Sequence, residues 1–190
     1  TLLSPKSLIT PKNYEAIKQC QSKNISICLC SGRPTKLITK FAEELELSKC
    51  NGYIISYNGE VLTECQTNKI IYSSFLPSKI IKEIIEKYRS LNVAFSIIDN
   101  QTGNLIFEKV ENNLSKFKRH AKLVVDDLTE NIPENPASFC IYVNKDDLVE
   151  LSEKIKKDFS VEVIKIFSEG IQITNKDIDN VFFLRSASDG

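Results

Sequence analysis

The sequence predicts an α/β fold with a doubly wound sheet, followed by a second, α+β domain. Over the first sixty residues, short apolar runs alternate with amphipathic segments across short links, as in sheets flanked by helices. After Gly59 the pattern changes to a hairpin and pairs of helices and strands. A chain of 190 residues, 42% hydrophobic and 26% charged, can form two small globular domains.

The first domain is expected to begin with a helix. Thr10 and Pro11 suit the N-cap and the first helical position. Residues 25–30 are a short apolar run, typical of a buried parallel strand. Residues 35–46 carry apolar side chains at helical spacing, and residues 53–56 form the next apolar strand.

The second domain is expected to mix antiparallel strands with two helices. The predicted strands are 70–72, 93–98, 105–107, 138–143 and 161–167, and the predicted helices are 79–91 and 145–158. The polar stretch 111–136 ends in prolines and predicts loops with a short helix.

The tripeptide Ser31-Gly32-Arg33 lies between a predicted strand and a predicted helix. A serine hydroxyl there can donate a hydrogen bond, a glycine lets backbone N–H groups approach a ligand, and a helix start adds partial positive charge. The pattern therefore predicts a small anion site. The alternative is that Ser31 only caps the helix and that Arg33 is a solvated surface charge.

Asn58-Gly59 follows the second predicted strand. On its own this dipeptide is a strong hairpin-turn signal. Ligands of doubly wound sheets bind beyond the carboxyl ends of the strands, and both Ser31 and Asn58 fall at such ends. The two sites are therefore expected to share one edge of the sheet.

The order of these segments resembles the Cof-type branch of the haloacid dehalogenase superfamily. The matching segments are Thr1-Leu2-Leu3 at the start, Ile9-Thr10-Pro11-Lys12-Asn13-Tyr14-Glu15-Ala16-Ile17, Ser31-Gly32-Arg33 and Tyr53-Ile54-Ile55-Ser56-Tyr57-Asn58-Gly59. The resemblance is specific over residues 1–62, looser through the middle, and returns at Gly170-Ile171-Gln172-Ile173-Thr174. It implies a Rossmann-like core with an inserted cap domain. The expected core is 1–64 and 168–190, incomplete as printed, and the expected cap is 65–167.

The resemblance also implies an activity. Members of this branch are magnesium-dependent phosphatases, so Mg²⁺ is the expected cofactor and a small phosphorylated metabolite, such as a sugar phosphate, the expected substrate. An aspartate attacks phosphorus and forms an aspartyl-phosphate, which water then hydrolyses. Ser31, Gly32 and Arg33 are expected to bind the phosphate. Thr1, Asn58 and Gly59 are expected to line the substrate cleft.

The chain departs from the family pattern at the reacting groups. The family's nucleophile and its acid/base aspartate would both lie just before Thr1, where the printed sequence begins. The family's later lysine, expected near Asn180-Val181, and its Gly-Asp-x-x-Asn-Asp metal loop are not found. None of the family's catalytic aspartates and no metal ligand can therefore be assigned. A catalytically inactive binding or regulatory protein and a phosphosugar mutase of the same superfamily remain alternatives.

Two further features bear on completeness. The chain contains no methionine, even at position 1, which suggests a fragment or an incomplete sequence. Read end to end, Val181-Phe182-Phe183-Leu184-Arg185-Ser186-Ala187-Ser188-Asp189-Gly190 followed by Thr1-Leu2-Leu3 mimics the family's opening motif. Chance is the favoured explanation, and ends that are out of order or permuted are the alternative.

Charge and hydropathy argue against several partners. The 25 basic and 25 acidic residues cancel, so a nucleic-acid partner has no electrostatic support. No apolar run approaches eighteen residues and no signal pattern opens the chain, so no membrane partner and a cytoplasmic location are expected. The oligomeric state is left open.

The reactive side chains give no clear metal signal. Six cysteines occur without a Cys-x-x-Cys pair and with a single histidine, which disfavours zinc. Cys28 and Cys30 are expected as small apolar core residues. Asp126-Asp127 and Asp146-Asp147 suit loops and helix starts better than metal sites. The basic run 116–120, which includes His120, predicts a solvated face or, alternatively, a basic patch that meets an anionic substrate.

Overall fold

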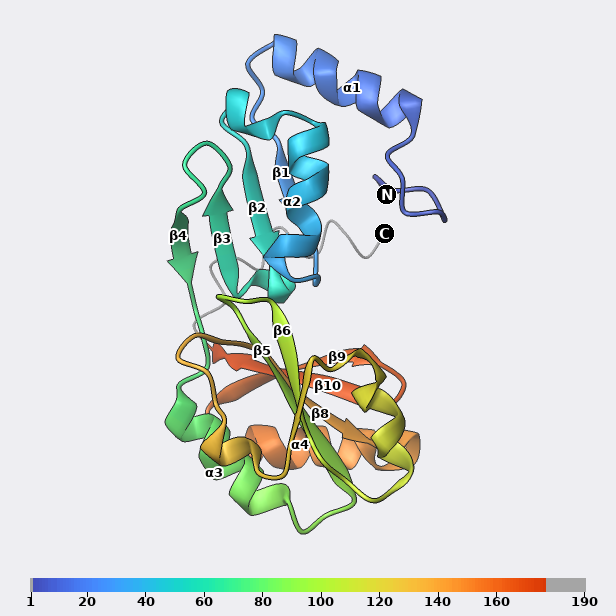
Figure 1. Cartoon of the computed structure of the whole chain (residues 1–190), viewed down its shortest axis with the longest axis vertical. Helices are drawn as coiled ribbons and strands as arrows, with labels where there is room; N and C mark the ends of the chain where they lie inside the picture. Colours follow the sequence, from blue (N-terminus) through green and yellow to red (C-terminus); the bar gives the residue numbers. More distant parts are fainter. Residues whose placement is uncertain (1, 177–190) are drawn as a thin grey trace. The chain divides into compact units, whose positions relative to one another are not determined.

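The computed structural model of this chain describes residues 2–176. The described chain divides into two compact units, and the boundary falls between Ser73 and Ser74. Each unit has its own sheet (Figure 1). The sequence analysis likewise expected a first α/β segment and a second segment with its own strands.

The first unit contains a four-stranded sheet. Its helices and strands are α1 (Pro11–Ser22), β1 (Cys28–Cys30), α2 (Thr35–Glu44), β2 (Tyr53–Ser56), β3 (Val61–Glu64) and β4 (Ile70–Ser73), with short 3₁₀ turns η1 (Leu47–Lys49) and η2 (Tyr57–Gly59). The strand order is β1-β2-β3-β4. β1 runs parallel to β2, whereas β3 and β4 pair antiparallel.

Local sequence accounts for the helices of this unit. The Thr10 side chain accepts a hydrogen bond from the N–H of Asn13 at 3.3 Å, and Pro11 opens α1, as predicted. The apolar stripe of α2 buries Ile38 and Phe41 in the same cluster as Leu29 of β1. This packing fixes the start of α2 beside the end of β1.

Two expectations for this unit are wrong. Cys28 and Cys30 are exposed rather than buried, because β1 turns only Leu29, between them, into the core. Residues 70–72 were placed in the second domain, but they form β4, which pairs with β3 in the first sheet. The predicted boundary at 64/65 therefore lies about nine residues too early.

The second unit contains a six-stranded sheet. Its helices and strands are α3 (Ser78–Tyr88), β5 (Val93–Asp99), β6 (Asn104–Glu108), β7 (Leu123–Val125), β8 (Pro136–Val143), α4 (Leu148–Asp158), β9 (Val161–Phe167) and β10 (Gly170–Asn175), with 3₁₀ segments η3 (Asn113–His120), η4 (Leu128–Glu130) and η5 (Lys145–Asp147). The strand order is β7-β6-β5-β8-β10-β9, and only the β6–β7 pair is parallel.

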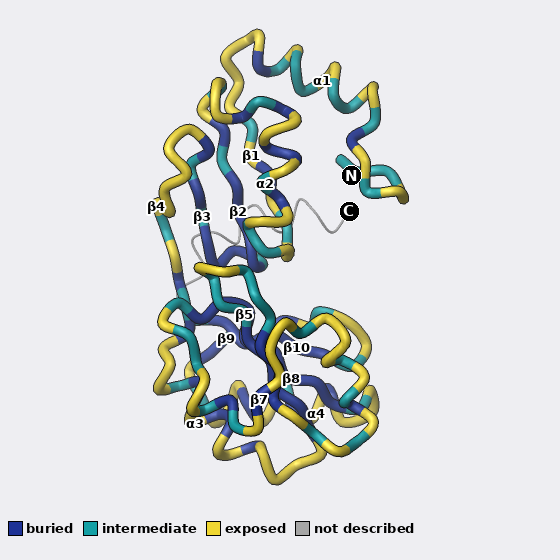
Figure 2. Tube along the Cα trace, viewed as in Figure 1, coloured by how far each residue is buried: buried dark blue, intermediate teal, exposed yellow. Residues whose placement is uncertain are grey.

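The two faces of this sheet have different covers. Apolar residues of α3 and α4 form one cluster with alternate residues of the central strands, such as Phe95 and Phe139. The intervening residues, such as Tyr142, join Leu114 of η3 in a second cluster. All eight residues of β8 are buried, which Figure 2 shows as a dark blue central strand. The sheet is thus packed on both faces at its centre.

Two further differences from the sequence expectation concern the second unit. β10 was assigned to the first domain, as part of 168–190, but it pairs with β8 and β9 in the six-stranded sheet. Residues 177–190 lie outside the described residues, and so does the end-to-end reading of the termini. The stretch 111–136 holds a strand, β7, in addition to the expected short helix. This strand was not predicted, because the apolar run Leu123-Val124-Val125 is only three residues long.

Candidate phosphate-binding site

Ser31 lies directly after the last residue of β1. Its N–H donates to the carbonyl of Ile55 at 3.0 Å, which extends the parallel pairing of β1 with β2 by one residue. Its Oγ accepts a hydrogen bond from the N–H of Arg33 at 3.2 Å. Within residues 2–176, the hydroxyl hydrogen of Ser31 has no acceptor. The serine is therefore held by its neighbours and keeps one donor for a ligand.

The start of α2 is uncapped. Pro34 occupies the N-cap position, and within the described chain no capping side-chain hydrogen bond is present. The alternative in which Ser31 caps this helix is therefore wrong. The first N–H groups of a helix carry partial positive charge and bind anions readily. These groups follow Ser31-Gly32-Arg33 immediately in the chain.

Asn58 contacts the glycine of the tripeptide. A Cβ atom added to Gly32 would lie 2.4 Å from Oδ1 of Asn58, so only glycine leaves room for this amide. Asn58 has a positive φ of 57°, and Tyr57 and Gly59 beside it have positive φ angles too. The N–H of Tyr57 donates to the carbonyl of Arg33 at 3.1 Å. The segments predicted to share one sheet edge therefore do meet.

One side-chain link was not foreseen from the sequence. The hydroxyl oxygens of Thr35 and Ser56 lie 2.6 Å apart. Thr35 is the first residue of α2 and Ser56 the last of β2, so the bond ties the helix start to the strand end. The positions of these two hydroxyls at element ends were the only signal available in the sequence.

A cavity of about 440 Å³ opens beside the tripeptide. Its lining residues are Leu2, Leu3, Cys28, Leu29, Cys30, Ser31, Arg33, Ile38 and Phe41. Among the described residues, this lining includes Arg33 and Ser31 and no aspartate or glutamate.

The predicted cleft residues differ in outcome. Thr1 lies outside the described residues. Asn58 is beside Gly32, as described above, whereas Gly59 is buried next to it in η2. Neither Asn58 nor Gly59 lines the cavity. Their predicted contact with a substrate stays a prediction.

The described chain does not supply a magnesium site. Among residues 2–176, no three histidine, cysteine, aspartate or glutamate side chains gather closely enough to hold a metal ion. Magnesium prefers oxygen ligands from carboxylates. Residues 2–176 by themselves therefore do not fit Mg²⁺.

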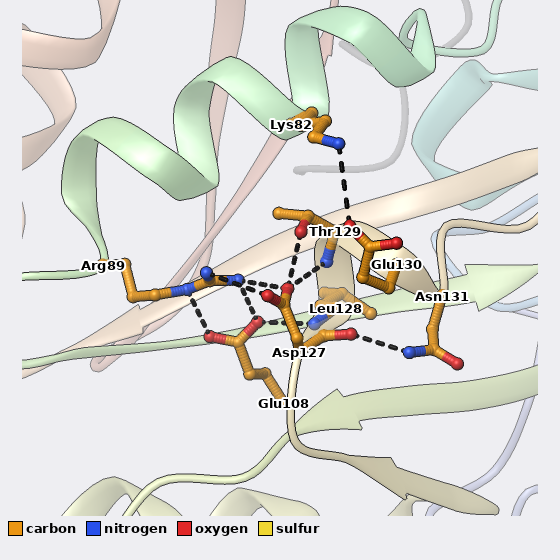
Figure 3. A network of polar contacts seen from close by, with 8 residues as sticks. All are labelled: Lys82, Arg89, Glu108, Asp127, Leu128, Thr129, Glu130 and Asn131. Carbon is orange, nitrogen blue, oxygen red and sulfur yellow. Dashed lines mark hydrogen bonds and ion pairs between the residues drawn. The ribbon is translucent and has the colours of Figure 1, made fainter.

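The main acidic cluster of the second unit is an ion network (Figure 3). Arg89 donates to Glu108 through Nε at 3.1 Å and Nη2 at 2.9 Å, and it contacts Asp127 at 2.6 Å. Glu108 also accepts from the N–H of Leu128 at 2.7 Å. Hydrogen bonds from Arg89 and Thr129 lower the pKa of Asp127 to about 2. Glu108 and Asp127 are thus paired within the fold. Asp127 also stands at the start of η4, as expected for an acidic residue at a helix start.

Comparison with known proteins identifies the family of this chain. A family model described as haloacid dehalogenase-like hydrolase matches residues 1–184. The chain belongs to the haloacid dehalogenase-like hydrolases. The predicted resemblance is thereby confirmed, and so is the α/β fold class with a Rossmann-like core.

Individual relatives agree with this family. YxeH of Bacillus subtilis, provisionally assigned as a phosphatase, is 30% identical over 71 residues, which are 37% of this chain and 26% of that protein. A Streptococcus pyogenes protein, M6_Spy0533, with the same kind of assignment is 22% identical over 129 residues, 66% of this chain and 45% of that protein. The chain thus spans less than half the length of the curated relatives it matches.

Solved structures share the fold. A haloacid dehalogenase-like hydrolase from Bacteroides thetaiotaomicron has a TM-score of 0.77 at 22% identity. The match covers 100% of this chain and 73% of that protein's chain. A Thermotoga maritima protein has a TM-score of 0.74 at 24% identity, and the match covers 100% of this chain and 72% of that one. A sugar phosphatase of subclass IIB has a TM-score of 0.69 at 18% identity, and the match covers 98% of this chain and 73% of that one. At these identities the likeness concerns the fold.

No helix among the described residues is both long and apolar enough to cross a bilayer.

Proposed function

We propose that this chain carries the phosphate-binding site of a phosphatase that acts on a small phosphorylated metabolite, such as a sugar phosphate. Membership of a hydrolase family supports the reaction class. The observation that carries the proposal is the placement of Ser31 after β1, beside the uncapped start of α2 and next to Asn58 across Gly32. Hydroxyl and N–H donors of the described residues converge there.

Ser31 donates its free hydroxyl hydrogen to one phosphoryl oxygen. The N–H of Arg33 already donates to Ser31 Oγ, which orients the hydroxyl toward the ligand. The first N–H groups of α2 and the guanidinium of Arg33 add positive potential for the other oxygens. Preorganised donors of this kind each lower the barrier by about 2.7–4 kcal/mol when charge develops in the transition state.

The remaining chemistry of the proposal follows the family. In the family scheme hydrolysis would go through an aspartyl-phosphate and Mg²⁺ would neutralise phosphoryl charge, and neither the aspartate nor the metal ligands are assigned to residues 2–176. In the family scheme a cap excludes water and recognises the leaving group, and the second unit is the candidate for that part. The proposal assigns to the described residues only the binding and orientation of the phosphoryl group, because they hold no carboxylate cluster. Nucleic acid and membrane have no place in it.

A second candidate is a binding or regulatory protein without catalysis. The missing carboxylate cluster among residues 2–176 favours it. Both candidates require phosphate binding at Ser31, and only the phosphatase requires turnover. Incubation with sugar phosphates and Mg²⁺, followed by assay of released phosphate, separates them.

Calorimetric titration with inorganic phosphate tests the shared requirement. We expect Ser31→Ala to weaken phosphate binding by about tenfold to a hundredfold, because a hydrogen bond to a charged group is lost. Ser26→Ala is the matched control: it removes an exposed hydroxyl just before the same strand, and binding should not change. Equal affinity of the two variants would show that Ser31 does not bind phosphate.

A further inference from the structure

β7 is an edge strand of the six-stranded sheet. It pairs with β6 on one side, and on its other side no strand lies among the described residues. Leu123 is 48% exposed and Val124 is 44% exposed, which is high for apolar residues of a strand. An open edge with apolar side chains is a ready template for pairing with another chain.

The backbone of Val124 faces the open edge. The carbonyl of Val125 accepts a hydrogen bond from the N–H of Lys109, on the β6 side, at 2.8 Å. Successive residues of a strand turn their backbone groups toward opposite neighbours. Within β7, Val124 therefore points its N–H and C=O groups away from β6, where a further strand would lie. The N–H of Lys122, just before the strand, donates to the carbonyl of Leu105 on the β6 side at 2.8 Å, so Lys122 offers only its side chain to a partner.

The charges around β7 are arranged antisymmetrically. The basic residues Lys116, Lys118, Arg119 and Lys122 precede it, and the acidic residues Asp126, Asp127, Glu130 and Glu134 follow it. Lys122 and Asp126 stand at equal distances along the chain from Val124, and both are exposed. Within residues 2–176 neither has an ion-pair partner. A sequence of this kind is complementary to itself when it is reversed.

We propose that two copies of this chain pair through β7, antiparallel and centred on Val124. In this register each Lys122 faces Asp126 of the partner subunit, and each Leu123 faces the partner's Val125. Val124 meets the partner's Val124 as a hydrogen-bonded pair, which its outward backbone allows. Two-fold symmetry makes every contact occur twice.

The charge pattern selects this register. Centring the pair on Leu123 places Lys122 opposite the partner's Val124. Centring it on Val125 places Lys122 opposite the partner's Leu128, which is fully buried. Only the pairing about Val124 sets opposite charges across from each other, where such pairs stabilise a sheet and like charges destabilise it. The same antiparallel order brings the basic segment of each copy toward the acidic segment of the other.

Sedimentation equilibrium of the whole chain tests the proposal. We expect a weak, reversible dimer at concentrations up to about 100 µM. Lys122→Glu and Asp126→Lys should each raise the dissociation constant by roughly tenfold or more, because two favourable pairs become two repulsive ones. Lys145→Glu, an equal charge change on an exposed residue outside β7 and its charged flanks, should have no effect.

Mixing the two single variants gives the decisive arm. Each variant alone should be monomeric, whereas the mixture restores opposite charges at both positions and should form a heterodimer. Circular dichroism should show the same folded signal for all variants, since the altered side chains are exposed. A monomer at every concentration, or a dimer that neither charge reversal weakens, would overturn the proposal.

Discussion

The ion network around Arg89 in the second unit and the Ser31 region of the first unit differ in how their polar groups are paired. In the second unit, Arg89 is shared between Glu108 and Asp127, and Glu108 also takes the N–H of Leu128. In the first unit, the hydroxyl of Ser31 and the first turn of α2 keep donors without acceptors among the described residues. Satisfied polar groups stabilise a fold, whereas preorganised unsatisfied donors are what a ligand site requires.

The cores differ in the same direction. Among residues 2–176, the main cluster of the second unit joins twenty buried residues from both helices and all six strands, whereas that of the first joins nine. Among these residues the second unit therefore buries more apolar side chains in one cluster. Substitutions in the two units should have different effects.

The largest effect is expected at Glu108 in the second unit. Its side chain is only 5% exposed and accepts three hydrogen bonds. Glu108→Ala leaves Arg89 and the N–H of Leu128 without this acceptor, and should lower the free energy of unfolding of that unit by about 2–4 kcal/mol. Urea denaturation followed by hydrogen exchange can report each unit separately.

Glu111→Ala is the control for this change. Glu111 is 84% exposed and contacts only Lys109, at 3.5 Å, so its loss should cost less than about 0.5 kcal/mol. If Glu108→Ala were equally mild, the network of Figure 3 would not hold the second unit together.

Two glycines of the first unit should respond differently to alanine. A Cβ at Gly52 would lie 2.5 Å from the Cβ and 2.8 Å from the backbone oxygen of Leu47, neither of which can yield easily. Gly52→Ala should therefore destabilise this unit by about 1–3 kcal/mol. At Gly32 the obstacle is the tip of the Asn58 side chain, so Gly32→Ala should cost less stability but displace Asn58.

Thermal unfolding and phosphate titration of both glycine variants check this prediction. Gly52→Ala should lower Tm and leave the phosphate affinity of the folded fraction intact. Gly32→Ala should change Tm little and weaken phosphate binding. The same response from both variants would remove the distinction between a packing glycine and a site glycine.

A smaller effect is expected from acid in both units. Hydrogen bonds from Lys18 and Lys49 lower the pKa of Glu46 to about 2, from 4.5, and Asp127 is lowered similarly, mainly by Arg89. A carboxyl whose pKa falls on folding adds stability above its unfolded pKa and loses it as the pH drops toward the folded value. Stability should therefore fall between pH 4.5 and about 2.

Single substitutions separate the two contributions. Glu46→Gln should flatten the acid dependence of the first unit alone, and Asp127→Asn that of the second alone. Hydrogen exchange of each unit across this pH range is the measurement. A change in the wrong unit would contradict the assignment of these ion pairs.

Local sequence signals predicted much of the fold. The strand limits 53–56 and 161–167 are confirmed, because apolar runs bounded by turn residues are visible without any tertiary information. Ser31 and Asn58 were placed at one sheet edge by the rule for parallel strands, and β1 and β2 are parallel.

Contacts between residues far apart in the chain could not be predicted from the sequence. Arg89 meets partners 19 and 38 residues away, and no periodicity marks such an arrangement. The transfer of β4 to the first sheet and of β10 to the second depends on which edge each strand joins, which composition does not encode. The exposure of Cys28 and Cys30 has the same origin, since burial follows from the neighbours that a strand acquires.

We expect phosphate to bind in the first unit and not on the basic run 116–120 of the second. Amide NMR spectra recorded during titration with inorganic phosphate test it directly. We predict saturable shifts at Ser31, Gly32, Arg33 and the first residues of α2, with Asn58 following. Shifts confined to residues 116–120, or no saturable shift at all, would contradict the account.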